Sequence, residues 1–185
     1  MNTSTPETPS YVGFNHKGSS LMGCPLTFLT IMEKVINNFI TATEIEIRYK
    51  SKVKATERPR VTASSDAAEI LRPIFNDLVE HREAMFALYL NRANKVLGYF
   101  LIGLGGISGV VADPKLIFQG ALKLNASGII LAHNHPSGNK TPGQADIDLT
   151  KKVKAGGAYL EVTLLDHLII LPDDSYFSLA DEGLL

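Results

Sequence analysis

The sequence predicts a three-layer α/β or α+β domain over residues 61–185, with strands and helices mixed along the chain. Short apolar segments of strand-like pattern alternate there with segments whose apolar residues recur at helical spacing. Apolar residues make up 45% of the 185-residue chain and charged residues 20%, a balance typical of globular proteins with a core. The length fits one ordinary domain with an extension rather than two full domains.

Composition narrows the classes of function. The formal net charge is −1, which gives no overall attraction to nucleic acids or membranes, although local patches remain open. Cys24 is the only cysteine, so no intrachain disulfide can form, which fits a reducing compartment such as the cytoplasm. No run of about eighteen apolar residues occurs, so we expect no transmembrane helix and no membrane partner.

The first 60 residues divide into two parts. Residues 1–43 are expected to form a flexible tail with a short amphipathic helix within 25–40, which would need the main domain or another subunit as its partner surface. Residues 44–60 are expected to form a basic strand, over 44–54, and a linker.

The stretch Arg48–Arg60 holds six Lys or Arg in thirteen residues. It can be interpreted as a contact for DNA or an acidic partner. The structural alternative, which we favour, is an edge strand that its lysines protect against aggregation.

The first elements of the main domain follow from capping residues and periodicity. A helix is expected to start at the N-cap Ser65, with Asp66 in its first turn and Pro73 kinking it or delaying its start. Two strands follow, over Ala84–Leu90 and Lys95–Ile102.

The remaining elements alternate between helix and strand. Asp113 followed by Pro114 is a strong helix start, and that helix should run to about Leu124. A second helix should begin at Thr141, with Gln144 completing a capping box. Apolar runs predict three strands, over Gly128–Ala132, Ala158–Leu165 and His167–Leu171.

Two histidines stand where the apolar strand of residues 128–132 ends. His133 and His135 are two residues apart, so in extended backbone their side chains point to the same side. Pro136 favours extended geometry at His135. Imidazoles in this arrangement can bind one Zn²⁺ together, although such a pair is often only part of a loop.

A third ligand is expected from Asp146, early in the helix that begins near Pro142. A turn rich in Gly and Pro can bring this helix back onto the strand end. Two imidazoles and one carboxylate leave a coordination position open for water, as in catalytic rather than structural zinc sites.

These residues resemble a known motif. The string from His133 to Gly138, His-Asn-His-Pro-Ser-Gly, followed by Thr-Pro-Gly-Gln-Ala-Asp146, is similar to the JAMM motif of MPN+ metalloproteases. The wording of that string, Leu165-Asp166-His167 and the closing Tyr-Phe-Ser-Leu-Ala-Asp-Glu-Gly resemble RadC-type proteins over roughly residues 61–185. The resemblance implies a JAB-like mixed sheet flanked by helices, in a three-layer arrangement like that of cytidine deaminases.

The resemblance also implies roles for residues. The two histidines and Asp146 would bind one Zn²⁺ per chain, and an upstream glutamate would act as general base. Glu83, directly before the strand Ala84–Leu90, matches that glutamate, and Glu80 is its nearest competitor.

One position departs from the motif. The family has a serine ten residues after the first histidine, which is thought to help stabilise the oxyanion, and this chain has Gly143 there. Ser137 or a backbone N–H could substitute for the missing hydroxyl. The departure places full peptidase activity in doubt.

Asp166 and His167 are candidates for orienting the metal ligands, or form a strand-end pair satisfied by the backbone. Asn134 is expected to stabilise the turn rather than bind metal.

The expected function is a zinc-dependent hydrolase that cleaves a peptide or isopeptide bond of a peptide or protein substrate. The alternative is a DNA-repair-associated accessory protein that contacts DNA or a repair partner through Arg48–Arg60, with a secondary or inactive metal site. The sequence leaves open whether the protein forms a homo-oligomer.

Overall fold

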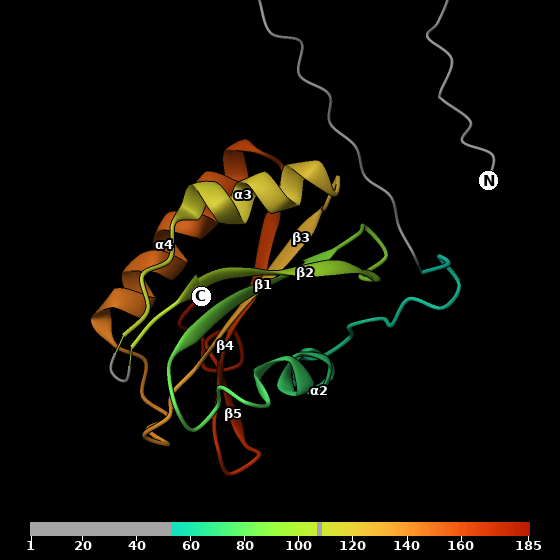
Figure 1. Ribbon diagram of the computed structural model, residues 1–185. Coiled ribbons are helices and arrows are strands. Elements are labelled where there is room, and N and C mark those ends of the chain that lie inside the picture. The colour runs from blue at the N-terminus through green and yellow to red at the C-terminus, as the bar shows by residue number, and fades with distance from the viewer. Residues whose placement is uncertain (1–52, 107–108) are drawn as a thin grey trace, which may run out of the picture. The chain divides into compact units, whose positions relative to one another are not determined.

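The computed structural model describes residues 53–106 and 109–185 (Figure 1). The helix expected within residues 25–40 and most of the strand expected over 44–54 lie outside the described residues. None of the described helices combines the length and the apolar character needed to cross a membrane.

The described chain forms a mixed five-stranded sheet in the order β2-β1-β3-β4-β5. β1 pairs antiparallel with both β2 and β3, β3 pairs parallel with β4, and β4 pairs antiparallel with the short β5. β3 is therefore the central strand. The bounds of the strands are Ala84–Leu90 for β1, Val96–Leu104 for β2, Gly128–Asn134 for β3, Thr163–Ile170 for β4 and Tyr176–Ser178 for β5.

Helices cover both faces of this sheet, which confirms the expected three layers (Figure 1). The helices are α2, Ser64–Phe75, on one face, and α3, Pro114–Lys123, with α4, Gln144–Tyr159, on the other. Residues of β1 alternate between two apolar clusters, because successive side chains of a strand point to opposite faces. Phe86 and Leu88 pack in the cluster of α2, whereas Met85 and Ala87 pack in that of α3 and α4.

The first two helices that the structure describes begin with different caps. The expected N-cap Ser65 is wrong, because α2 starts at Ser64 and the Asp66 carboxylate accepts the N–H of Ala63 at 3.1 Å. Pro73 lies in the last turn of α2, where the helix ends two residues later. α3 begins as predicted, with the Asp113 carboxylate accepting the Lys115 N–H at 2.9 Å.

α4 begins later than predicted. Its N-cap is Gly143, and the capping acceptor is the Asp146 carboxylate, which accepts the Gly143 N–H at 2.8 Å. The expected capping box of Thr141 and Gln144 is therefore wrong. Gln144 instead donates from its side chain to Asp148 at 2.8 Å.

The late strands also differ from expectation. α4 continues to Tyr159, so the strand expected to start at Ala158 begins only at Thr163. The two strands expected over 158–171 are one continuous β4, and the three-residue β5 was missed. β3 extends two residues beyond Ala132 and so includes His133 and Asn134.

Candidate metal centre

Two imidazoles meet at the end of the central strand. His133 is the sixth residue of β3 and has 1% of its surface exposed, because it faces the layer of α3 and α4. His135 lies one residue beyond β3, where its backbone N–H still bonds to the Ile170 carbonyl of β4 at 3.2 Å. Extended backbone thus places both side chains on one side, and their Nε2 atoms lie 3.0 Å apart.

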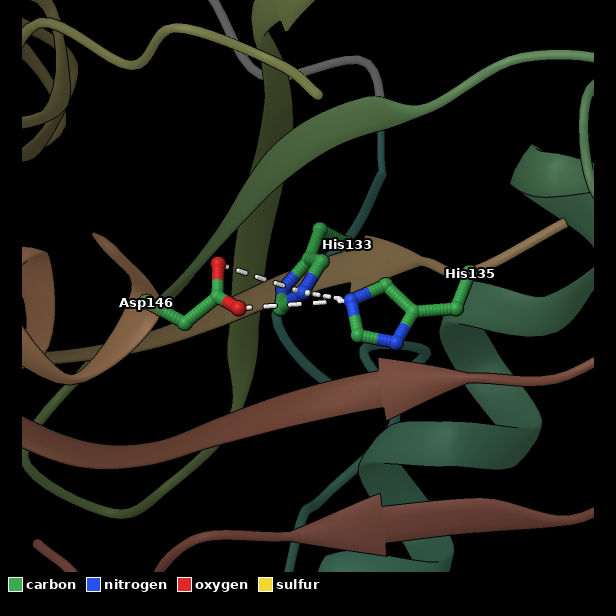
Figure 2. Close-up of side chains that lie close together, drawn as sticks. All are labelled: His133, His135 and Asp146. Carbon is green, nitrogen blue, oxygen red and sulfur yellow. Dashed lines mark hydrogen bonds and ion pairs between the residues drawn. The ribbon is translucent and has the colours of Figure 1, made fainter. Parts of the chain in front are cut away.

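The Asp146 carboxylate completes this cluster from the first turn of α4 (Figure 2). Its Oδ1 lies 3.4 Å from His133 Nε2, and its Oδ2 lies 4.0 Å from His135 Nε2. The three residues can offer ligand atoms that all lie within 4.8 Å of one another. Burial alone would raise the pKa of Asp146, but the hydrogen bond and charge of His133 and the Gly143 N–H together lower it to about 2.

Hydrogen bonds at the Nδ1 atoms orient the two rings. His135 Nδ1 lies 2.7 Å from the carbonyl oxygen of Asn139, so it must carry a proton and donate. His133 Nδ1 lies 2.9 Å from Nε2 of His167. With the Nδ1 atoms held in this way, both Nε2 atoms face Asp146 and each other. A cation bound by both Nε2 atoms would take the place of their 3.0 Å contact with each other.

Asp166 and His167, neighbours on β4, point to opposite faces of the sheet. His167 is wholly buried beside His133, and burial lowers its pKa to about 3, so the ring is neutral. The Asp166 carboxylate instead accepts hydrogen bonds from the Ser178 hydroxyl and the Ala180 N–H, at 2.8 and 3.1 Å. Strand alternation thus separates the two candidates: His167 contacts His133, whereas Asp166 faces away from the metal ligands and bonds partly to the backbone, as in the alternative interpretation.

Glu83 borders an open cleft of about 390 Å³ in front of the cluster. The cleft is lined by the possible ligands His135 and Asp146 and by small or polar residues: Gly109, Val110, Ser137, Asn139, Thr141, Gly143 and Ala145. Glu80, the competing candidate, is exposed and does not line the cleft. The structure therefore brings Glu83, and not Glu80, to the same cleft as the cluster.

Two anchors fix the backbone around Glu83. Its N–H donates to the Gly106 carbonyl and its carbonyl accepts from the Gly105 N–H, both at 2.8 Å. The neighbouring residue Ala84 donates its N–H to the side chain of Asn134 at 2.8 Å. Asn134 is fully buried, and its amide nitrogen lies 3.0–3.1 Å from the carbonyl oxygens of Leu78, Val79 and Arg82.

Asn134 therefore fastens the segment before β1 to the strand that carries His133. The sequence indicated a structural role for this residue in its own turn, but the anchoring of the Glu83 segment was missed. The sequence offered only a polar residue between two histidines as a signal for it.

The two groups considered as substitutes for the missing serine hydroxyl differ in their hydrogen bonds. Ser137 is exposed at the cleft, where its hydroxyl accepts a long hydrogen bond of 3.4 Å from the Asn139 N–H. The Gly143 N–H already bonds to Asp146. Sequence reasoning missed Thr150, whose buried hydroxyl lies 2.7 Å from Nδ1 of His167.

Comparison with known proteins agrees with this architecture. A family model described as a RadC-like JAB domain matches residues 61–184. A protein of Flavobacterium johnsoniae, named only as a UPF0758 protein, is 38% identical over 159 residues, which cover 86% of this chain and 68% of the relative.

Two further relatives carry the same name. The one from Porphyromonas gingivalis is 42% identical over 137 residues, which cover 72% of this chain and 60% of the relative. The one from Aquifex aeolicus is 37% identical over 142 residues, which cover 77% of this chain and 58% of the relative. The matched region thus spans little more than half to two thirds of these relatives.

Proposed function

Because this chain belongs to the RadC-like JAB domain family, we propose that it is a zinc-dependent hydrolase that cleaves a peptide or isopeptide bond. One observation carries the proposal. His133, His135 and Asp146 present ligand atoms within 4.8 Å of one another, at a cleft that Glu83 also lines.

The donor set fits zinc. Two imidazole nitrogens and one carboxylate oxygen are typical ligands of catalytic Zn²⁺, whereas Ca²⁺ and Mg²⁺ prefer oxygen ligands throughout. The bonds at both Nδ1 atoms also fit, because ligating histidines usually donate their second ring N–H to a protein acceptor. Three protein ligands would leave one coordination position for water, which suits catalysis.

The roles in the proposed reaction follow from the two kinds of group at the cleft. Bound zinc would polarise the scissile carbonyl as a Lewis acid and lower the pKa of the attacking water. Glu83 takes a proton from that water and passes it to the amine that leaves when the C–N bond breaks. The cleft is open to solvent, and small side chains make up part of its lining, which leaves room for a peptide segment.

The developing oxyanion needs a donor other than the missing serine hydroxyl. The Ser137 hydroxyl is one candidate, because it lines the cleft. The other is the start of α4, where the first N–H groups have no partner within the helix and Ala145 also lines the cleft. The Gly143 N–H is not available, since Asp146 accepts it.

The alternative function in DNA repair rests on Arg48–Arg60, of which the structure describes only residues 53–60. Among the residues described, we find no observation that favours DNA over a peptide substrate.

The proposal is tested by metal analysis and hydrolysis together. Protein purified without chelator is assayed for zinc beside His133→Ala, and both are then offered quenched-fluorescence peptide and isopeptide libraries. We expect about one zinc per chain and cleavage that a chelator abolishes in the unmodified protein, and neither in the variant. A protein that takes up no zinc, even when zinc is added, would overturn the proposal.

A further inference from the structure

A buried hydroxyl on α4 contacts both the proposed ligand Asp146 and His167, the neighbour of the proposed ligand His133. Thr150 lies one helical turn after Asp146 and has 1% of its surface exposed. Its hydroxyl donates to the backbone carbonyl of Asp146 at 2.6 Å, and the same oxygen lies 2.7 Å from Nδ1 of His167. A hydroxyl has a single proton, so Thr150 must accept a hydrogen bond from His167 Nδ1–H.

The proton on His167 Nδ1 also determines which nitrogen of the His133 ring carries a proton. His167 is wholly buried, and within the described part of the chain its ring forms hydrogen bonds with His133 and Thr150 but with no carboxylate, so it carries one ring proton. With that proton on Nδ1, its Nε2 can only accept. The partner of Nε2 is His133 Nδ1, 2.9 Å away, which must therefore donate.

We propose that Thr150 and His167 are positioning residues that set the tautomer of His133 and so keep its Nε2 available for the metal. The inference rests on the proposed function and deepens it. A chain of hydrogen bonds runs from His133 Nδ1 through His167 and Thr150 to the backbone of Asp146, and thus joins two proposed ligands.

A merely structural role is the alternative, because threonine hydroxyls in helices often bond to the carbonyl four residues earlier. That bond alone would explain the contact of Thr150 with Asp146. It does not explain why the same oxygen receives the second ring nitrogen of a histidine whose first ring nitrogen meets His133.

Loss of the hydroxyl should reverse the order of protons. Without an acceptor at Nδ1, His167 gains by carrying its proton on Nε2 instead. It would then donate to His133 Nδ1, which leaves the single proton of a neutral His133 on Nε2, the atom that faces Asp146. Metal binding must then first shift protons in two rings.

The experiment compares Thr150→Val, which removes the hydroxyl at nearly constant shape, with Thr150→Ser, which keeps it. Thr163→Val, at the exposed start of β4, is the control for the same substitution away from the site. Zinc affinity is measured by competition with a chromogenic chelator, and the ring tautomers are measured by long-range ¹H–¹⁵N NMR of the histidines.

We expect Thr150→Val to bind zinc about ten- to a hundredfold more weakly, as removal of partners of metal ligands typically does. Thr150→Ser should stay within about threefold of the unmodified protein, and Thr163→Val should not change. The unmodified protein should carry the His167 proton on Nδ1, and Thr150→Val should move it to Nε2.

The possible failures are distinguishable. An unmodified protein that binds no zinc overturns the proposed function and the inference with it. Normal zinc affinity in Thr150→Val, or equal losses in the valine and serine variants, overturns only the inference. If Thr150→Val does not fold, the tautomer in the unmodified protein decides, because a His167 proton on Nε2 contradicts the proposed hydrogen-bond chain.

Discussion

At the scale of single residues, the carboxylates of Asp146 and Glu83 border the same cleft but differ in their hydrogen-bond partners. Asp146 is fixed by the Gly143 N–H and by His133, and its pKa is lowered to about 2, so it stays ionised. The Glu83 side chain makes no hydrogen bond or ion pair within the described part of the chain, although its backbone is anchored. A carboxylate that is held in place and stays ionised is suited to bind a metal cation. A carboxylate without a hydrogen-bond partner at a cleft is suited to accept and pass on a proton.

Replacing Glu83 by glutamine tests this difference. The amide cannot take a proton, so turnover should fall by about a hundredfold or more while zinc content stays the same. Steady-state kinetics and elemental analysis of the same preparations measure the two effects. Glu80→Gln, three residues away and exposed, is the matched control and should leave turnover unchanged. If Glu83→Gln loses its zinc instead, Glu83 is a ligand or a structural residue.

Position 143 offers a second test, because a serine there would restore the hydroxyl of the motif. We expect Gly143→Ser to raise kcat/KM on an amide substrate, by at most the hundred- to thousandfold that one oxyanion donor typically contributes. The backbone allows the change: φ is −73°, and an added Cβ would lie 3.3 Å from Asp146 Oδ2, a close contact that a small shift relieves.

The control is Gly143→Ala, which adds the Cβ without the hydroxyl. Because residue 143 is the N-cap of α4, the serine hydroxyl could instead cap the helix, which would change stability by only a few tenths of a kcal/mol relative to glycine. Equal rates for the serine and alanine variants, with unchanged zinc content, would show that the hydroxyl does not serve the oxyanion.

At the scale of elements, one strand supplies both halves of the site. Successive residues of β3 point to opposite faces, so His133 faces α3 and α4 while Asn134 faces the segment that leads to Glu83. The position of the proposed base relative to the proposed ligands is thus set by adjacent residues of a rigid central strand.

Asn134→Leu should therefore destabilise the fold. The change removes the amide that satisfies the Ala84 N–H and the carbonyls of the 78–82 segment, and each buried group left unpaired costs about 1–3 kcal/mol. Urea denaturation should show a free energy of unfolding lower by about 3 kcal/mol or more. Asn76→Leu, at an exposed position, should change it by no more than about 0.5 kcal/mol. A loss as small for Asn134→Leu would contradict the anchoring role.

The sequence predicted the apolar elements better than their ends. β1 and α3 were predicted closely, because a continuous buried run and the pair Asp113-Pro114 are strong local signals. The N-caps of α2 and α4 were each predicted two residues away, because in both helices an aspartate in the first turn replaces the cap expected at the serine or threonine. β5 has only three residues and forms through its pairing with β4, which no local pattern reveals.

The candidate site also has a part that the sequence predicted and a part that it did not. The cluster of His133, His135 and Asp146 followed from spacing and from the resemblance, and the structure places the three together. Thr150 and the anchoring role of Asn134 could not be predicted, because their partners lie 17 to 56 residues away and meet only through the sheet and helix packing.

At the scale of the whole molecule, apolar packing and satisfied hydrogen bonds hold the described domain together. Among the described residues, no buried side-chain nitrogen or oxygen lacks a hydrogen-bond partner. Two apolar clusters pack on the two faces of the sheet, and neither is built around the candidate metal centre.

Zinc should therefore add stability to a domain that folds without it. At a free zinc concentration a hundred times the dissociation constant, the gain is about 2.7 kcal/mol, which corresponds to roughly 10 °C in Tm for a domain of this size. Thermal melts of chelator-treated protein, with and without added zinc, measure the shift, and His133→Ala should show none. A chelator-treated protein that lacks a cooperative transition would contradict the prediction.

The packing of the apolar clusters has a consequence for the way in which the protein would acquire zinc. A chain whose two apolar clusters are not built around the candidate metal centre can fold first and take up zinc later. Under the proposed function, the amount of active enzyme would then depend on the zinc available around it. When zinc is scarce, the chains without zinc would remain folded rather than misfold.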